Sequence, residues 1–113
     1  MVKKLIPESI AKLTEAYLLE VRKDIFIEKA ILFGSFAKGV FDKESDIDLL
    51  LVSPSFEEQA DKSWTLLLKK RELFYNYPGY RSIEVIPMSN HQYYSNTISP
   101  LLAEIRKTGL EIS

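Results

Sequence analysis

Two short apolar runs constrain the fold of this chain more than any other feature. Residues 30–33 (AILF) form the first run, which stops at Gly34. Residues 49–52 (LLLV) form the second, which follows the alternating stretch at residues 46–48 (DID). Runs this short are typical of buried strands, because a strand that is covered on both faces has no polar side. We therefore predict buried strands at residues 30–33 and 46–52.

Longer segments with apolar residues three and four positions apart predict the helices that cover these strands. They lie at residues 8–25, 55–74 and 99–109. In the second segment, Ser55 and Glu58 have the spacing of a capping box, and Trp64 falls on the apolar face, where we expect it in the core.

Shorter signals complete the order of elements. Ser99 and Pro100 have the chemistry of a helix cap followed by a first helical residue. Residues 36–39 predict a single helical turn, and residues 82–86 predict a strand that Pro87 stops. Residues 110–112 predict a last short strand. The fold class that follows is α/β, a small mixed sheet with helices packed on it.

Length and charge exclude several classes of protein. The chain has 113 residues, the size of one domain, so we expect a single domain over residues 1–113. It holds 15 Lys and Arg against 16 Asp and Glu, a net charge of -1. This balance argues against a protein that coats the nucleic-acid backbone. The chain has no cysteine, which excludes thiolate zinc sites and cysteine nucleophiles.

The chain offers one histidine, His91, which lies in a polar stretch and is expected on the surface. Any metal site must therefore be built mainly from oxygen ligands. No apolar run approaches the roughly 20 residues of a membrane span. Residues 1–7 are basic, but the apolar stretch of a signal peptide does not follow them. We expect no membrane association and a cytoplasmic location.

The first candidate for chemistry is the pair Gly34-Ser35, between a strand and a helical turn. Glycine allows close approach of the backbone to a ligand, and free N–H groups with the serine hydroxyl suit a phosphate. An ordinary turn explains the pair as well when it is taken alone.

The second candidate is a set of carboxylates. Asp46 and Asp48 share one face of a predicted strand, with Cα atoms about 6.5–7 Å apart. Glu84 lies in the next predicted strand among apolar neighbours. Together they could hold one or two magnesium ions, or they could be exposed residues of a solvated strand edge. Aspartate is depleted in strands, and like charges on one face repel, which favours a bound cation.

Residues 32–39 (LFGSFAKG) with residues 45–49 (SDIDL) resemble the signature of the minimal nucleotidyltransferases, small members of the DNA polymerase beta-like superfamily. The resemblance is close over residues 31–52 and looser to Glu84 and the segment 100–109. It implies the nucleotidyltransferase fold. It also implies magnesium-dependent transfer of a nucleoside monophosphate, AMP from ATP or the equivalent from another NTP, to a hydroxyl acceptor.

The resemblance also implies roles for single residues. Gly34 and Ser35 would hold the triphosphate, and Lys38, at a position that is often basic in the family, would help to neutralise it or would be an exposed lysine.

Asp46 and Asp48 would bind magnesium, and Glu84 would be the third metal-binding and catalytic acid, where the family often has aspartate. Ser45 would orient Asp46 or cap a turn.

The family resemblance further implies a partner. Minimal nucleotidyltransferases are commonly paired with a HEPN-type toxin, and the transferase can adenylylate a toxin tyrosine and act as the antitoxin. The glutamate at position 84 keeps an alternative open, a catalytically weak nucleotide-binding module that neutralises its partner by contact alone. The tyrosine-rich segments around residues 74–80 and 93–94 could support a partner surface, a homo-oligomer or core packing.

Overall fold

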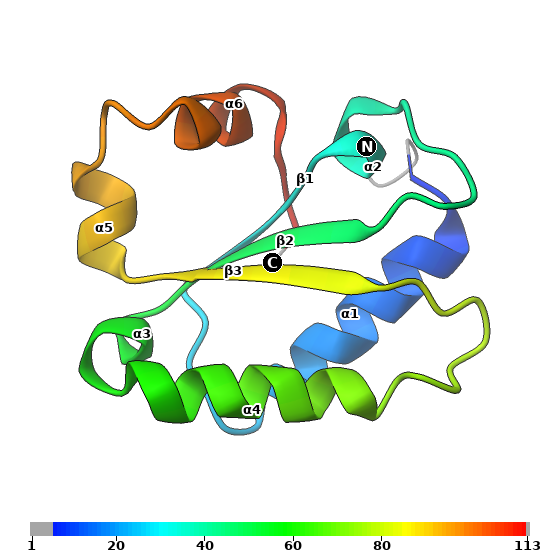
Figure 1. The fold of residues 1–113 in the computed structure, drawn as a ribbon, viewed down its shortest axis with the longest axis horizontal. Coiled ribbons are helices and arrows are strands. Elements are labelled where there is room, and N and C mark those ends of the chain that lie inside the picture. Colours follow the sequence, from blue (N-terminus) through cyan, green and yellow to red (C-terminus); the bar gives the residue numbers. More distant parts are fainter. Residues whose placement is uncertain (1–5, 113) are drawn as a thin grey trace.

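The computed structural model describes residues 6–112, so residues 1–5 of the basic N-terminal segment lie outside the described part. Figure 1 shows the arrangement of the elements. In chain order they are α1 (Glu8–Arg22), β1 (Lys29–Phe33), α2 (Ser35–Lys38), β2 (Ile47–Val52), α3 (Ser55–Glu58), α4 (Ala60–Glu72), β3 (Ile83–Met88), α5 (Asn90–Ser95), α6 (Pro100–Thr108) and β4 (Leu110–Glu111). None of the helices within residues 6–112 has the length and apolar character that spanning a bilayer requires.

The strands form one four-stranded mixed sheet in the order β3-β2-β1-β4. β1 pairs antiparallel with β2 and with β4, and β2 pairs parallel with β3. Helices α1 and α4 cover one face, and α5 and α6 lie on the other (Figure 1). The predicted fold class, a small mixed sheet with helices packed on it, is confirmed.

The alternation of side chains along β2 divides the core in two. Leu49 and Leu51 face the larger cluster under α1 and α4, while Leu50 and Val52 face the smaller cluster under α5 and α6. All four side chains are fully buried. The predicted two-sided burial of this run is therefore confirmed. Because Asp48 lies two residues before Leu50, it is on the same face of the sheet as Leu50, the face under α5 and α6.

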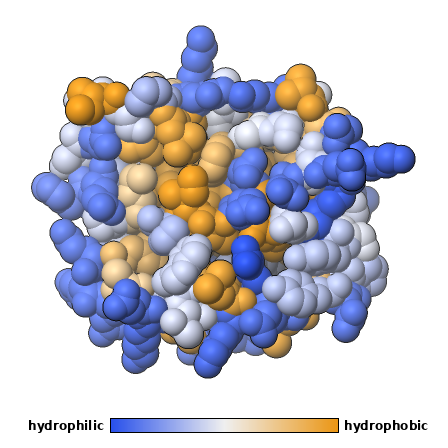
Figure 2. Space-filling view, in the orientation of Figure 1, coloured by the Kyte–Doolittle hydropathy of each residue, from blue (hydrophilic) through white to orange (hydrophobic). Residues whose placement is uncertain are grey.

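Apolar residues of β1, β2 and β3 that face α5 and α6 are covered less completely than those that face α1 and α4. Phe33, Ile86 and Met88 lie against the smaller cluster but are only partly buried. Figure 2 shows apolar side chains gathered in the middle of the molecule in the same orientation, with hydrophilic side chains around them. Asp48 and Glu84 belong to this more open face, since they lie two residues from Leu50 and Ile86 on their strands.

β3 extends through Pro87 to Met88, two residues beyond the predicted end. The main-chain N–H of Ile47 donates to Ser82, and that of Ser53 donates to Met88. The main-chain N–H and C=O groups of even-numbered β3 residues therefore point toward β2, and those of odd-numbered residues point away from it. Because Pro87 points outward on an edge strand, its missing N–H costs the sheet no hydrogen bond.

Residues 69–71 (KKR) form a basic run on α4, but the side chain of Arg71 is half-buried. Its Nη1 donates to the outward main-chain oxygen of Ile83 at 2.7 Å. Arg71 therefore fixes the beginning of β3 to α4.

The predicted helix over residues 55–74 is two helices, because the chain leaves helical geometry at Gln59 (φ -134°, ψ 48°). Pro54 is the N-cap residue of α3, and Ser55 makes no capping hydrogen bond, so the predicted capping box is wrong. Trp64 is 41% exposed and lies outside the core clusters, contrary to the prediction.

The capping box of this chain begins instead at Ser89. Its Oγ accepts from the N–H of Gln92 at 3.1 Å, and Oε1 of Gln92 accepts from the N–H of Ser89 at 3.1 Å. This capping box begins α5, a helix that was not predicted from the sequence. The predicted cap at Ser99 is confirmed, since its Oγ accepts from the N–H of Leu102 at 3.2 Å and Pro100 is the first helical residue.

Candidate functional site

The turn after β1 brings the backbone against a carboxylate. Gly34 adopts φ 77° and ψ -153°, a conformation that residues with a side chain rarely adopt. A Cβ added at this position would lie 2.2 Å from Oδ2 of Asp48. Both the conformation and the contact therefore require glycine, and the glycine lets Asp48 lie directly beside the turn.

Three carboxylates lie at this end of the sheet. In the register, Asp48 is opposite Phe33 of β1 on one side and Glu84 of β3 on the other. Asp46 lies just before β2. We call Asp46, Asp48 and Glu84 the carboxylate rim. Asp48 is half-buried, and the other two are exposed.

The members of the carboxylate rim affect one another. Burial raises the pKa of the Asp48 carboxyl above its usual value, and the negative charges of Asp46 and Glu84 raise this pKa further. Among residues 6–112, no member of the rim forms an ion pair. The charged form of Asp48 is thus disfavoured until a positive group comes close.

The donor set fits magnesium, a hard cation that prefers carboxylate oxygens. Within the described part of the chain, no group of three or more acidic or histidine side chains is gathered closely enough to hold a metal ion by itself. Magnesium commonly uses one or two carboxylates and completes its shell with water and substrate phosphates. The unneutralised charge around Asp48 is the observation that favours a cation here.

The side chain of Lys38 already has an ionic partner. Its Nζ forms an ion pair with the Glu104 carboxylate of α6. Both side chains line a cleft of about 180 Å³ that also reaches Phe33, Gly34 and Thr108. Typical ligand pockets measure roughly 300–1,000 Å³, so this cleft would hold part of a nucleotide. The phosphate role of Lys38 stays a prediction.

The loop between α2 and β2 is held by side-chain contacts. Ser45 Oγ accepts from the main-chain N–H of Asp42 at 2.9 Å and lies 3.3 Å from Asp42 Oδ1. Of the two predicted roles of Ser45, the structure shows the cap of a turn. Arg81 Nη1 donates to the main-chain oxygens of Asp42 at 3.1 Å and Ser45 at 2.7 Å.

Two residues of this region were missed from the sequence, Arg81 and Glu104. Arg81 donates hydrogen bonds to main-chain carbonyls, and contacts of this kind leave no pattern in the sequence. Glu104 is an exposed acidic residue on the predicted helix after Pro100, and only the packing of α6 brings it beside Lys38. His91, expected on the surface, is exposed.

The aromatic segments divide between core and surface. Phe74 is buried and meets Tyr17 at a ring-centroid distance of 6.2 Å, whereas Tyr75 is 53% and Tyr94 is 57% exposed. Core packing thus explains part of the predicted aromatic cluster, and the exposed rings remain available to a partner.

A model of the nucleotidyltransferase domain family matches residues 16–95, most of the chain. The matched range contains Gly34, Ser35, Lys38 and the whole carboxylate rim.

Two curated relatives come from Methanocaldococcus jannaschii, and each bears the name "Putative protein adenylyltransferase". One is 50% identical over 44 residues, which is 38% of this chain and 44% of the relative. The other is 33% identical over 58 residues, which is 46% of this chain and 59% of the relative. The matches thus span about half the length of these relatives.

A solved structure, a "putative nucleotidyltransferase" from Sulfolobus solfataricus, superposes with a TM-score of 0.57. The match covers 89% of this chain and 77% of the other chain at 19% identity. At this identity the likeness supports the fold alone.

Proposed function

This chain belongs to the nucleotidyltransferase domain family, and from that premise we propose that it is a magnesium-dependent adenylyltransferase. The proposed reaction transfers AMP from ATP to a hydroxyl acceptor. The relatives named as protein adenylyltransferases support both the choice of nucleotide and a protein as the acceptor.

One observation carries this proposal. The Asp48 carboxylate lies against Gly34, where a Cβ would come within 2.2 Å of Oδ2, and the charges of Asp46 and Glu84 act on it. A turn suited to phosphate and a set of acidic oxygens suited to magnesium thus meet at one place. Phosphoryl-type transfer needs positioning and charge stabilisation more than covalent chemistry, which suits a chain without cysteine.

The roles of the residues follow from this arrangement. The acceptor oxygen attacks the α-phosphorus, the bond between the α-phosphorus and the bridging oxygen breaks, and pyrophosphate leaves with that electron pair. Gly34 and Ser35 would bind and orient the triphosphate. Glu84, which is exposed, would accept the proton of the attacking hydroxyl. Magnesium held by the carboxylate rim would stabilise the charge on the attacking and leaving oxygens.

The acceptor that we propose is a tyrosine hydroxyl on a HEPN-type protein partner, so that the chain acts as an antitoxin. The resemblance of the glycine-serine and double-aspartate motifs to the minimal nucleotidyltransferases supports this acceptor. A homo-oligomer, one of the alternatives for the tyrosine-rich segments, stays a prediction from the sequence.

The test measures ATP binding by calorimetry with and without magnesium, for the wild-type protein and for the Asp46→Asn/Asp48→Asn variant. We expect magnesium-dependent binding that the variant loses. A second assay follows α-labelled ATP into a HEPN-type partner and into its tyrosine-to-phenylalanine variant. Magnesium-independent binding, or label that does not depend on the two aspartates, would contradict the proposal.

The second candidate function is a nucleotide-binding module that silences its partner by contact. It is favoured by the observation that, among residues 6–112, no three acidic side chains gather into a ready metal cluster. If this candidate is correct, Asp46→Asn/Asp48→Asn leaves the protective effect on the partner unchanged. Loss of protection together with retained partner binding supports catalysis instead.

A further inference from the structure

We propose that Arg81 is a positioning residue that fixes the loop carrying Asp46 relative to the Gly34 turn. This inference rests on the adenylyltransferase proposed above and adds a residue to it. Arg81 is half-buried, and its side chain joins the segment that carries it to two others, the loop before β2 and α2.

The first contact is with the loop before β2. Nη1 of Arg81 donates to the main-chain oxygens of Asp42 and Ser45 at 3.1 and 2.7 Å. Ser45 directly precedes Asp46, so the guanidinium holds the peptide unit that leads into this carboxylate. The side chains of residues 42–44 are exposed, so they add little packing that could fix the loop.

The second contact is with α2. The guanidinium carbon of Arg81 lies 5.5 Å from the ring centroid of Phe36, within the range of a cation–π interaction. Phe36 is buried and follows Ser35 directly. Its ring also stacks on Phe41, with 4.7 Å between centroids and 26° between planes. Arg81 and Phe41 therefore attach both halves of the loop to the helix that follows Gly34.

The third segment is the one that carries Arg81 itself, since Arg81 lies three residues before Glu84. One side chain thus relates the three places from which the site residues come: the turn after β1, the beginning of β2 and the beginning of β3. A guanidinium is suited to this task because its planar group can donate in several directions while stacking on a ring.

The hydrogen-bond partners of Arg81 leave the charge of the carboxylate rim unchanged. Arg81 donates its hydrogen bonds to main-chain carbonyls, and no member of the carboxylate rim forms an ion pair within residues 6–112. Arg81 thus holds the loop without forming an ion pair that would compete with a divalent cation for the carboxylates. Its loss should therefore change the geometry of the carboxylates, not their charge.

The chain offers a matched control in Arg106. Its Nη1 donates to the main-chain oxygen of Asn96 at 3.0 Å, its Nη2 donates to that of Tyr93, and its guanidinium carbon lies 4.9 Å from the Tyr93 ring centroid. Arg106 makes the same set of contacts between α5 and α6, away from the carboxylate rim.

The experiment compares Arg81→Gln with Arg106→Gln in the whole chain. The main measurement is the magnesium concentration that half-saturates ATP binding and AMP transfer. We expect this concentration to rise about 10- to 100-fold in Arg81→Gln, as for residues that orient metal ligands, and to stay within about twofold in Arg106→Gln. Equal magnesium dependence in the two variants would overturn the proposal, because a purely structural role lowers stability without changing this concentration.

Amide hydrogen exchange of residues 40–46 supplies an independent measurement. We expect faster exchange there in Arg81→Gln and not in Arg106→Gln. If the wild-type protein neither binds ATP nor transfers AMP, the proposed function is contradicted. The hydrogen-exchange result then still tests whether Arg81 fixes the loop. Equal exchange in the two variants overturns the role of Arg81 whatever the activity shows.

Discussion

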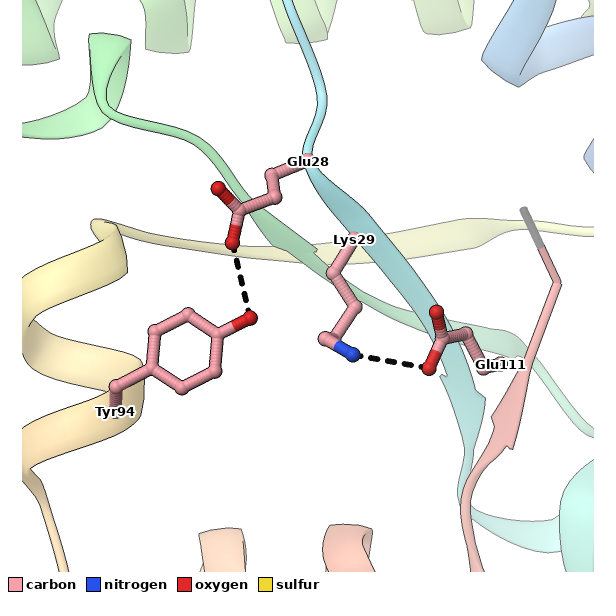
Figure 3. Close-up of polar contacts among 4 residues, drawn as sticks. All are labelled: Glu28, Lys29, Tyr94 and Glu111. Carbon is pink, nitrogen blue, oxygen red and sulfur yellow. Dashed lines mark hydrogen bonds and ion pairs between the residues drawn. The ribbon is translucent and has the colours of Figure 1, made fainter.

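The two ends of the sheet carry similar acidic groups in different surroundings. At the end where β1 begins, each carboxylate in Figure 3 has a partner: Tyr94 donates its hydroxyl to Glu28 at 2.9 Å, and Lys29 lies 3.0 Å from Glu111. At the end where β1 stops, the carboxylate rim has no ion-pair partner within residues 6–112.

This difference separates two uses of charge. A carboxylate with a hydrogen-bonded or ionic partner contributes modestly to the folded state, and its charge is already neutralised in part. Asp48 has the opposite setting, because burial and two neighbouring negative charges all raise its pKa. Natural chains tolerate such repulsion where a ligand relieves it. Substitutions at the two ends should therefore affect different properties of the protein.

The largest effect is expected from Asp48→Asn compared with Glu28→Gln. The first removes a repulsive charge and an oxygen that we propose to bind magnesium, so AMP transfer should fall by about a hundredfold or more while stability stays equal or rises slightly. Glu28→Gln should lower stability slightly and leave transfer unchanged. Transfer rates and urea unfolding check both. A clear loss of stability in Asp48→Asn would show that this carboxylate has a structural role.

A smaller effect is expected from Gly34→Ala compared with Gly39→Ala. Both glycines have φ 77°, but a Cβ at Gly34 meets Asp48, whereas a Cβ at Gly39 has no atom within 4 Å. Gly39→Ala should cost about 1 kcal/mol from backbone strain alone. Gly34→Ala should in addition displace Asp48 and reduce transfer about 10- to 100-fold. Similar transfer rates in the two variants would refute the importance of the close approach.

A third prediction concerns the ion pair between Lys38 and Glu104. If Lys38 contributes to phosphate binding, Glu104→Gln frees it and should lower the KM for ATP, and Lys38→Met should raise it. Because exposed ion pairs are worth up to about 1 kcal/mol, the change should not exceed about fivefold. Steady-state kinetics at fixed magnesium measure it. An unchanged KM in both variants would assign Lys38 to packing of α6.

The smallest effect is expected at Tyr94. Its hydrogen bond to Glu28 raises the pKa of the phenol above its usual value. The folded state therefore holds this proton more tightly than the unfolded state, so the stabilisation is present below about pH 10 and is lost as the pH rises further. Tyr94→Phe should remove that dependence and leave transfer unchanged. Urea unfolding on both sides of this pH measures the difference.

The parts of the fold that were predicted correctly are those in which local sequence and burial agree. The apolar runs at residues 30–33 and 49–52 lie in strands that are covered on both faces, and Ser99 caps its helix as its position suggests. Gly34 was predicted to let the backbone approach a ligand, which stays a prediction, and the structure adds a close contact with Asp48 that also requires glycine.

The parts that were missed depend on tertiary contacts. α5 has a capping box, but its residues are mostly polar and only Tyr93 is buried, so no apolar spacing revealed it. Pro87 was expected to end β3, and the strand continues because that residue faces the open edge. The contacts of Arg81 join segments 36 and 39 residues apart, and no local pattern encodes them.

The outward-facing main chain of β3 also bears on aggregation. An exposed edge strand is a template on which another chain can add a strand. Here Pro87 offers no N–H at the edge, and Arg71 already occupies the Ile83 oxygen. The opposite edge is β4, which has only two residues. Within residues 6–112, neither edge offers a long ladder of free main-chain groups, so the sheet resists intermolecular β-pairing.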